Sequence, residues 1–181
     1  METLDNNNWN ATAKHVWWQG KTNPVWQGYY LDLPYVNEPF NDPASLAEWR
    51  ALGYTQTKFT GDMYDMRNPE PKWIEAIRKV LPWKHFSWSV YRMEPGCCLP
   101  THGDTYARFC KLYNITDFNT IHRAIFFMED WQSGHVFEID GLPQYHWCAG
   151  DYYVWQYNTP HLAANVGKTN RYSLQITGVI E

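Results

Sequence analysis

Apolar and polar residues alternate in short runs through the second half of the chain, which is the pattern of antiparallel strands. Aromatic and β-branched residues make up these runs, and Gly, Pro, Asn and Asp separate them. The predicted strands cover residues 86–93, 123–128, 136–139, 152–157, 162–166 and 172–179. Many short strands at this spacing indicate a sandwich or a barrel. We therefore predict a mainly β domain with the double-stranded β-helix (jelly roll) fold.

Two helices are predicted before the first of these strands. Asp42 suits the N-cap of a helix, Pro43 suits its first turn, and Gly53 suits its end. A second helix is expected over 69–81, because apolar residues there fall at i, i+4 and i+7 and Pro82 stops the run. We expect both flanking helices to pack on one sheet of the jelly roll.

The whole chain, 1–181, is predicted to be a single domain. Its length allows a sizeable core, and no repeat, linker or block of like charges divides it. We place the jelly-roll core at approximately 86–181 and assign 1–85 a supporting role, part helical and part extended. Aromatic residues make up 18% of the chain, and we expect most of them to fill the interior. The alternative is that some of them line a substrate groove.

Charge and cysteine content narrow the class of protein. The net charge is -4 and no cluster of Lys and Arg is visible, which argues against nucleic-acid binding. The apolar runs are far shorter than the roughly 20 residues that span a bilayer, and the first residues lack the pattern of a secretion signal. The cysteines have no CxxC spacing, so we expect reduced thiols in a cytoplasmic protein. They are Cys97, Cys98, Cys110 and Cys148.

The candidate chemistry is concentrated in His102, Asp104 and His161. Side chains alternate along an extended segment, so His102 and Asp104 point to the same side with Gly103 between them. His161 has to return from a distant strand to meet them. Two imidazoles and one carboxylate are the protein ligands of the facial sites that hold non-heme Fe(II). A His-x-Asp pair also occurs as a surface hydrogen bond, so the triad alone leaves that alternative open.

Arg171 and Ser173 add a second part to the predicted site. They share one face of the last predicted strand with Gln175, opposite an apolar face. A guanidinium presents a rigid pair of donors to a carboxylate, and the serine hydroxyl adds a third. Burying an arginine without a partner is costly, so this polar row on the concave side of a barrel predicts an anionic ligand. The alternative is an arginine on the protein surface.

These motifs resemble those of the Fe(II)/2-oxoglutarate-dependent dioxygenase superfamily, whose members have a double-stranded β-helix core. The resemblance covers roughly 86–178. The residues that match the HxD…H iron triad and the RxS pair of that family are His102, Asp104, His161, Arg171 and Ser173. In the family, the arginine of the pair binds the distal carboxylate of 2-oxoglutarate.

Within that superfamily the chain is most similar to the aspartyl/asparaginyl β-hydroxylase-like and prolyl hydroxylase-like branches. The segments similar to the first branch are Glu94-Pro95-Gly96 through Pro100-x-His102, Trp147-x-x-Gly150-Asp151 and His161…Asn165…Arg171. By the same comparison Arg123 falls near an arginine that contacts the cosubstrate in that branch, and Tyr91 falls at a position that lines the cosubstrate pocket. Many animal members of that branch have glycine at the position of Asp104, whereas prolyl hydroxylases share the complete triad. Substrate identity therefore does not transfer.

The resemblance implies an enzyme that uses Fe(II), 2-oxoglutarate and dioxygen to hydroxylate an aliphatic C–H bond, with release of succinate and carbon dioxide. Its substrate would be a peptidyl residue, an amino acid or another small molecule. Two alternatives stay open: a cupin-like metal protein without 2-oxoglutarate chemistry, and an aromatic-lined binding module without a metal. Arg171 and Ser173 distinguish the enzyme from the first alternative, and the triad distinguishes it from the second.

Overall fold

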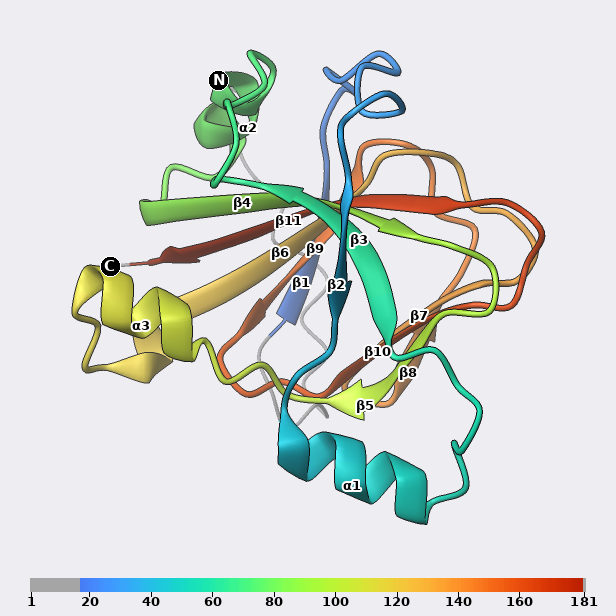
Figure 1. Ribbon diagram of the computed structural model, residues 1–181. Coiled ribbons are helices and arrows are strands. Elements are labelled where there is room, and N and C mark those ends of the chain that lie inside the picture. Colours follow the sequence, from blue (N-terminus) through green and yellow to red (C-terminus); the bar gives the residue numbers. More distant parts are fainter. Residues whose placement is uncertain (1–16, 181) are drawn as a thin grey trace.

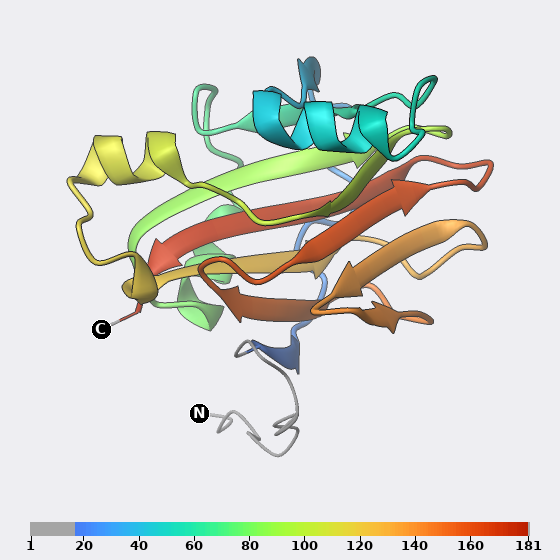
Figure 2. The same cartoon turned by 90° about the horizontal axis from the view of Figure 1, so that it is seen from below.

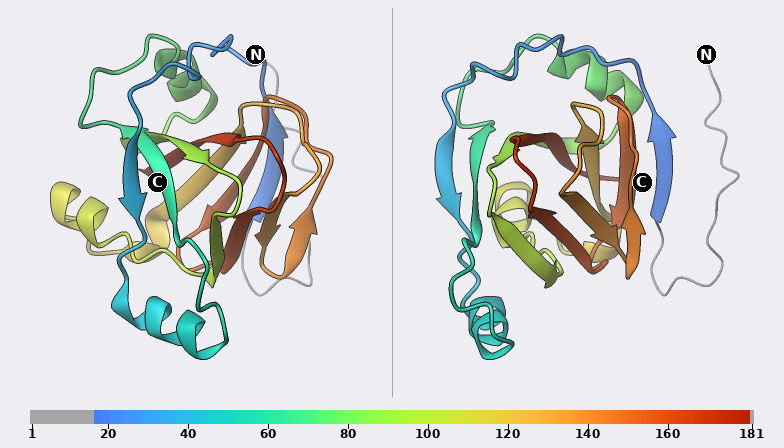
Figure 3. Two further views of the ribbon diagram at one scale, coloured as in Figure 1. Left: turned by 45° about the vertical axis from the view of Figure 1, so that its right-hand side comes forward. Right: turned by 90° about the vertical axis from the view of Figure 1, so that its right-hand side faces the viewer.

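Two antiparallel sheets face each other in the computed structural model, which describes residues 17–180 (Figure 1). The strands of the larger sheet are, in spatial order, β1 (Trp17–Lys21), β9 (Asp151–Gln156), β6 (Ile121–Phe127), β11 (Arg171–Val179), β4 (Lys84–Met93), β3 (Thr60–Asp65) and β2 (Val36–Pro39). Those of the smaller sheet are β5 (Cys98–His102), β10 (His161–Asn165), β7 (His135–Ile139) and β8 (Leu142–Gln144). The predicted double-stranded β-helix is confirmed, and Figure 3 shows the two sheets enclosing its interior.

All six predicted strands are present, with ends that differ from the prediction by two residues at most. Three strands of the larger sheet, β1, β2 and β3, precede residue 86, so the sheet extends into the region that was assigned a supporting role. The sequences of these segments do not have the pattern that predicts strands. β3 contains Gly61, Asp62 and Asp65, which disfavour strands, and β2 ends at Pro39. Proline fits an edge strand, and β2 is the edge of its sheet.

The helices are α1 (Pro43–Ala51), α2 (Ile74–Val80) and α3 (Ala107–Tyr113), with a short 3₁₀ helix at Phe118–Thr120. α1 begins after Asp42 as predicted. α2 begins later than predicted, because the chain makes a turn just before Ile74. α3 was not predicted: Tyr106 and Asn114, which flank it, adopt left-handed conformations and supply no side-chain cap. Among residues 17–180, no helix has the length and apolar character needed to cross a membrane.

The expectation that both predicted helices pack on one sheet is correct for α2 alone. Ile74 and Ile77 of α2 are fully buried against the outer face of the larger sheet. Figures 1 and 2 place α1 and α3 away from α2. The one buried residue of α1 is Trp49, whose ring contacts Phe40 and Phe59. A helix with a single buried side chain covers no sheet face, so α1 is anchored locally.

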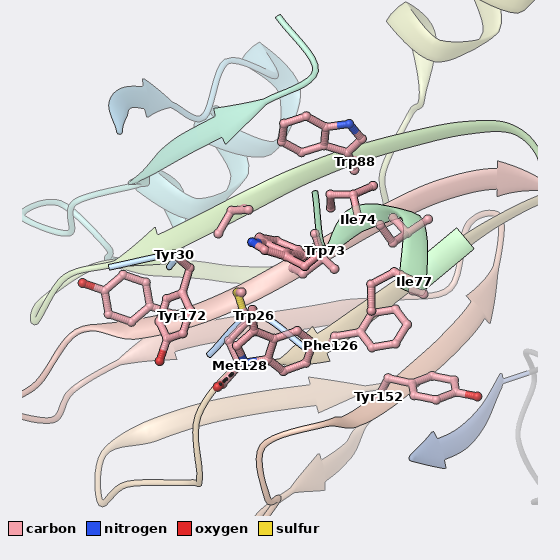
Figure 4. Packing of buried hydrophobic residues seen from close by; sticks show 14 of the residues in the cluster. Trp26, Tyr30, Trp73, Ile74, Ile77, Trp88, Phe126, Met128, Tyr152 and Tyr172 are labelled. Carbon is pink, nitrogen blue, oxygen red and sulfur yellow. Dashed lines mark hydrogen bonds between the residues drawn. The ribbon is translucent and has the colours of Figure 1, made fainter. Parts of the chain in front are cut away.

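The main core lies between α2 and the outer face of the larger sheet (Figure 4). Trp26 is 1% exposed, packs edge-to-face on Trp73, and donates its indole N–H to the carbonyl of Met128 at 2.8 Å. Phe126 and Tyr152 stack with ring centroids 4.6 Å apart. Offset and edge-to-face aromatic pairs add stability to the area that they bury. The prediction that most aromatic residues fill the interior is confirmed for this cluster.

The alternation along β11 divides its side chains between this core and the space between the sheets. Tyr172, Leu174 and Ile176 belong to the outer core, as their period of two predicts. Arg171, Ser173, Gln175 and Thr177 point to the other side and line a cavity. The apolar half of the strand thus holds it to the core while the polar half faces the interior of the barrel.

Replacing Asp42 with alanine should lower the free energy of unfolding by about 1 kcal/mol. The Asp42 carboxylate accepts hydrogen bonds from the Ser45 amide at 2.9 Å and from the Ser45 hydroxyl at 2.7 Å. Urea unfolding followed by fluorescence measures the loss. Asp32, an exposed aspartate in a turn, is the matched control, and Asp32→Ala should change stability by less than about 0.5 kcal/mol. Equal losses in both variants would contradict the capping role.

Candidate metal centre

His102, Asp104 and His161 meet at one end of the smaller sheet. His102 is the last residue of β5 and His161 the first of β10, and the two are paired directly across these antiparallel strands. Their ring centroids are 4.5 Å apart, and His161 Nε2 lies 3.7 Å from Asp104 Oδ2. One potential ligand atom from each of the three residues lies within 4.8 Å of the other two. The structure therefore brings the predicted triad together.

Both histidines are oriented by backbone carbonyl groups. Nδ1 of His102 lies 2.7 Å from the carbonyl oxygen of Pro100, and Nδ1 of His161 lies 3.0 Å from that of Thr159. A carbonyl oxygen only accepts, so each Nδ1 carries the proton and each Nε2 keeps its lone pair. This is the arrangement that metal-binding histidines use to fix tautomer and ring orientation. The donor set thus fits a divalent metal.

Burial also favours the neutral form of His161, which is the form that binds a metal. Its pKa is lowered to about 4, first because the buried ring is poorly solvated, although the nearby Asp104 acts in the opposite direction. The imidazole is therefore neutral at pH 7, the state in which it can bind a metal. Aromatic rings shield the centre: Trp155 lies 5.0 Å from the ring of His161, and Phe40 lies 5.3 Å from that of His102.

Arg123 pairs with the carboxylate of the triad. Its Nη2 and Nε donate to Asp104 Oδ2 at 2.8 and 3.1 Å. Burial alone would raise the pKa of Asp104, but Arg123 first, and then His161, hold that pKa well below its usual range. The resemblance predicts a contact between Arg123 and the cosubstrate, and that contact stays a prediction. What the structure shows is a carboxylate held ionised and in one orientation.

Arg171 is a buried cation without an acidic partner in the part of the chain that the structure describes. It is 3% exposed, and its Nε has no hydrogen-bond partner among the described residues. The guanidinium carbon lies 5.7 Å from the ring centroids of Phe127 and Trp147, and Nη1 lies 3.7 Å from the sulfur of Met93. Burial lowers the pKa of Arg171 to about 10, so it remains charged at pH 7. Within residues 17–180, its surroundings supply ring faces and a thioether, and no countercharge.

Ser173 and Tyr91 lie beside Arg171. They are paired across β11 and β4, and both line the same cavity as the triad and Arg171. Tyr91 is 8% exposed, and its ring lies against Gly61 of β3, where an added Cβ would come within 2.1 Å of the phenol. The sequence analysis did not identify Gly61. A glycine within a segment as long as a strand could have indicated this close approach. Glycine at this position leaves room for the ring.

One cavity of about 750 Å³ joins these groups. His102, Asp104 and His161 line it, as do Arg123, Tyr91, Arg171 and Ser173, so every predicted site residue faces the same space. Its volume is in the range of small-molecule sites. α3 also contributes to its wall, through Phe109 and Leu112. The chemical capacity of the site is to hold a metal and, beside it, an anion.

Comparison with known proteins supports the fold. No protein-family model matches the chain, and no curated protein matches it. Among solved structures, a prolyl-4-hydroxylase of Pseudomonas putida has a TM-score of 0.53 at 16% sequence identity, over 92% of this chain and 94% of that one. A predicted oxalate decarboxylase of Thermotoga maritima has a TM-score of 0.43 at 15% identity, over 68% and 84%.

A third solved structure is a Klebsiella pneumoniae protein with a double-stranded β-helix domain. Its TM-score is 0.37 at 14% identity, over 52% of this chain and 67% of that one. Of the three, the Pseudomonas putida protein alone has a TM-score above 0.5. At such identities the comparison bears on architecture and not on activity. The two facing antiparallel sheets, together with the match to the Pseudomonas putida structure, support the double-stranded β-helix fold, and the His/Asp/His cluster could hold a metal ion.

Proposed function

We propose that the protein is an Fe(II)- and 2-oxoglutarate-dependent oxygenase that hydroxylates an aliphatic C–H bond of a peptidyl residue, an amino acid or another small molecule. The observation that carries the proposal is Arg171. A guanidinium that is 3% exposed and lacks a countercharge among the described residues faces the cavity that also contains the His/Asp/His cluster. A metal next to a buried cation calls for a ligand with two anionic ends.

The protein's own residues would divide the work as follows. His102, Asp104 and His161 would hold the iron, and Arg171 with Ser173 would bind the far carboxylate of 2-oxoglutarate. Bound iron would supply dioxygen activation coupled to oxidation of 2-oxoglutarate: one oxygen atom enters the substrate C–H bond to give an alcohol, and the other enters succinate as carbon dioxide leaves. The aromatic rings around the centre, including Trp155 and Phe137, would exclude water from it.

A cupin-like metal protein without 2-oxoglutarate chemistry would share the fold and the triad. It would have no use for Arg171, whose burial without a countercharge in the described chain lowers stability unless a ligand offsets it. The aromatic-lined binding module would need neither Arg171 nor the His/Asp/His triad.

A reducing compartment suits ferrous iron, and the four cysteines are free thiols, so we place the protein in the cytoplasm.

Anaerobic titration with Fe(II) and then 2-oxoglutarate tests the proposal. We expect a weak visible charge-transfer band from the chelated complex, and its loss in His161→Ala. Glutarate is the matched control ligand, because it has both carboxylates but no 2-oxo group and should bind without producing the band. Succinate formation on admission of air should follow. A protein that binds Fe(II) but produces neither band nor succinate would be the cupin-like alternative.

A further inference from the structure

Four uncharged polar side chains form a second polar area in the cavity. Ser87 and Ser89 of β4 are paired with Thr177 and Gln175 of β11, respectively, and all four line the cavity. We call these four residues the neutral row. The function proposed above uses none of them.

The neutral row lies toward the metal centre, on the side away from Arg171. Thr177 is paired across β11 and β6 with Arg123, the residue that contacts Asp104. Along β11 in the other direction the inward-facing residues are Ser173 and Arg171. A molecule on the neutral row and an anion on Arg171 would therefore occupy different parts of the cavity. Both parts belong to the cavity that His102, Asp104 and His161 also line.

The side chains of the neutral row have few hydrogen-bond partners among the described residues. In residues 17–180, no hydrogen bond engages the side chains of Ser89, Gln175 and Thr177, and Ser87 donates only to the sulfur of Met66 at 3.2 Å. Thr177 is 6% exposed, and its hydroxyl, which is accessible from the cavity, has no hydrogen-bond partner in the described chain. Polar side chains that line a cavity and have no partner in the described chain are available to hydrogen-bond to water or to a ligand. Hydroxyls and an amide offer both donors and acceptors.

Charged side chains near the neutral row already have partners or are exposed to solvent. Arg67 at the rim of the cavity donates to Asp65 at 2.8 Å and to Glu38 at 3.1 Å. Asp104 is paired with Arg123. Arg108, on α3, is exposed, where solvent screens it. A charged group that entered the neutral row would lose its water and gain no ion pair, which is strongly unfavourable.

We propose that the neutral row is the substrate subsite, and that it selects an uncharged hydrogen-bonding group, a carboxamide or a hydroxyl, close to the C–H bond that is oxidised. The assignment of this group to a substrate rests on the proposed function. Its selectivity rests on the unpartnered side chains and on the neutralised charges around them. Isosteric molecules that differ only in charge are therefore the appropriate probes.

Calorimetric binding to the Mn(II)-loaded protein tests the proposal without turnover. The probes are N-acetylglutamine methylamide with its carboxylate isostere N-acetylglutamate methylamide, and erythritol with erythronate. In at least one pair the neutral probe should bind at least tenfold more tightly, because a charged group loses its hydration without compensation. Equal binding in both pairs, tighter binding of the carboxylates, or no binding of either neutral probe at millimolar concentration overturns the proposal.

A charge placed in the neutral row provides the second arm. Gln175→Glu should lower the affinity for the neutral probe at least tenfold. Gln144→Glu, on the exposed strand β8, should leave that affinity within twofold of the wild-type value. Melting temperatures of both variants report whether they fold. Unchanged probe binding in folded Gln175→Glu overturns the subsite. If neutral probes bind in a manner that depends on Gln175 but 2-oxoglutarate does not bind, the subsite stands as a binding site and the proposed oxygenase function fails.

Discussion

Arg171→Met should remove 2-oxoglutarate binding and also make the ligand-free protein more stable. Truncating one partner of a buried, hydrogen-bonded charge pair costs about 2 to 5 kcal/mol of binding, so the affinity for 2-oxoglutarate should fall by about 30-fold or more. Without ligand the guanidinium is buried among Phe127, Phe137 and Trp147 and has no countercharge in the described chain. Methionine fills similar space, so stability should rise by about 1 to 2 kcal/mol.

Arg171→Met is diagnostic because it should lower the affinity for 2-oxoglutarate and raise the stability of the ligand-free protein. A structural arginine would lower stability when removed, whereas a ligand-binding arginine kept at the expense of stability should raise it. Calorimetry with 2-oxoglutarate on the Mn(II)-loaded protein and urea unfolding without ligand measure the two effects. Mn(II) affinity should remain within about threefold. Arg108→Met, at the exposed rim of the cavity, is the control. It should change the affinity for 2-oxoglutarate by no more than about twofold and should not raise the free energy of unfolding. Destabilisation of Arg171→Met, with loss of Mn(II), would contradict the assignment.

The alternation of β11 explains why this residue could be identified from sequence. A period of two separates Arg171 and Ser173 from Leu174 and Ile176, so burial of one face fixes where the other points. The same rule placed His102 and Asp104 on one side of an extended segment. Strands with a regular pattern therefore reveal both the sheet and the side chains that line its interior.

Other parts of the site cannot be identified from the local sequence. Arg123 and Asp104 are 19 residues apart and become partners only through the packing of the two sheets. α3, whose Phe109 and Leu112 line the cavity, follows Tyr106, a residue in the left-handed conformation that propensity rules do not anticipate before a helix. β3 was hidden by its glycine and aspartates. These features depend on tertiary contacts, which override local preference.

Asp104→Ala should abolish metal binding and lower the stability of the metal-free protein by about 2 kcal/mol. The first effect follows because the triad loses its carboxylate. The second follows because Arg123, whose side chain is 18% exposed, keeps its charge but loses the oxygen that accepts from both Nε and Nη2. Urea unfolding in the presence of a chelator measures the second effect, and Mn(II) calorimetry measures the first. His161→Ala should abolish metal binding without leaving a charge unpaired.

A double-mutant cycle separates the loss of the ion pair from other consequences of the substitution. Arg123→Met in the Asp104→Ala background removes the stranded charge, so the double variant should recover about 1 kcal/mol or more relative to Asp104→Ala. It should still bind no metal. Wild-type protein with Mn(II) at about 100 times its dissociation constant should gain about 2.7 kcal/mol, and none of these variants should. If Asp104→Ala were as stable as the wild type without metal, the ion pair with Arg123 would contribute nothing to folding. Asp104 would then be held in place by the metal itself, and preorganisation of the centre by Arg123 would be wrong.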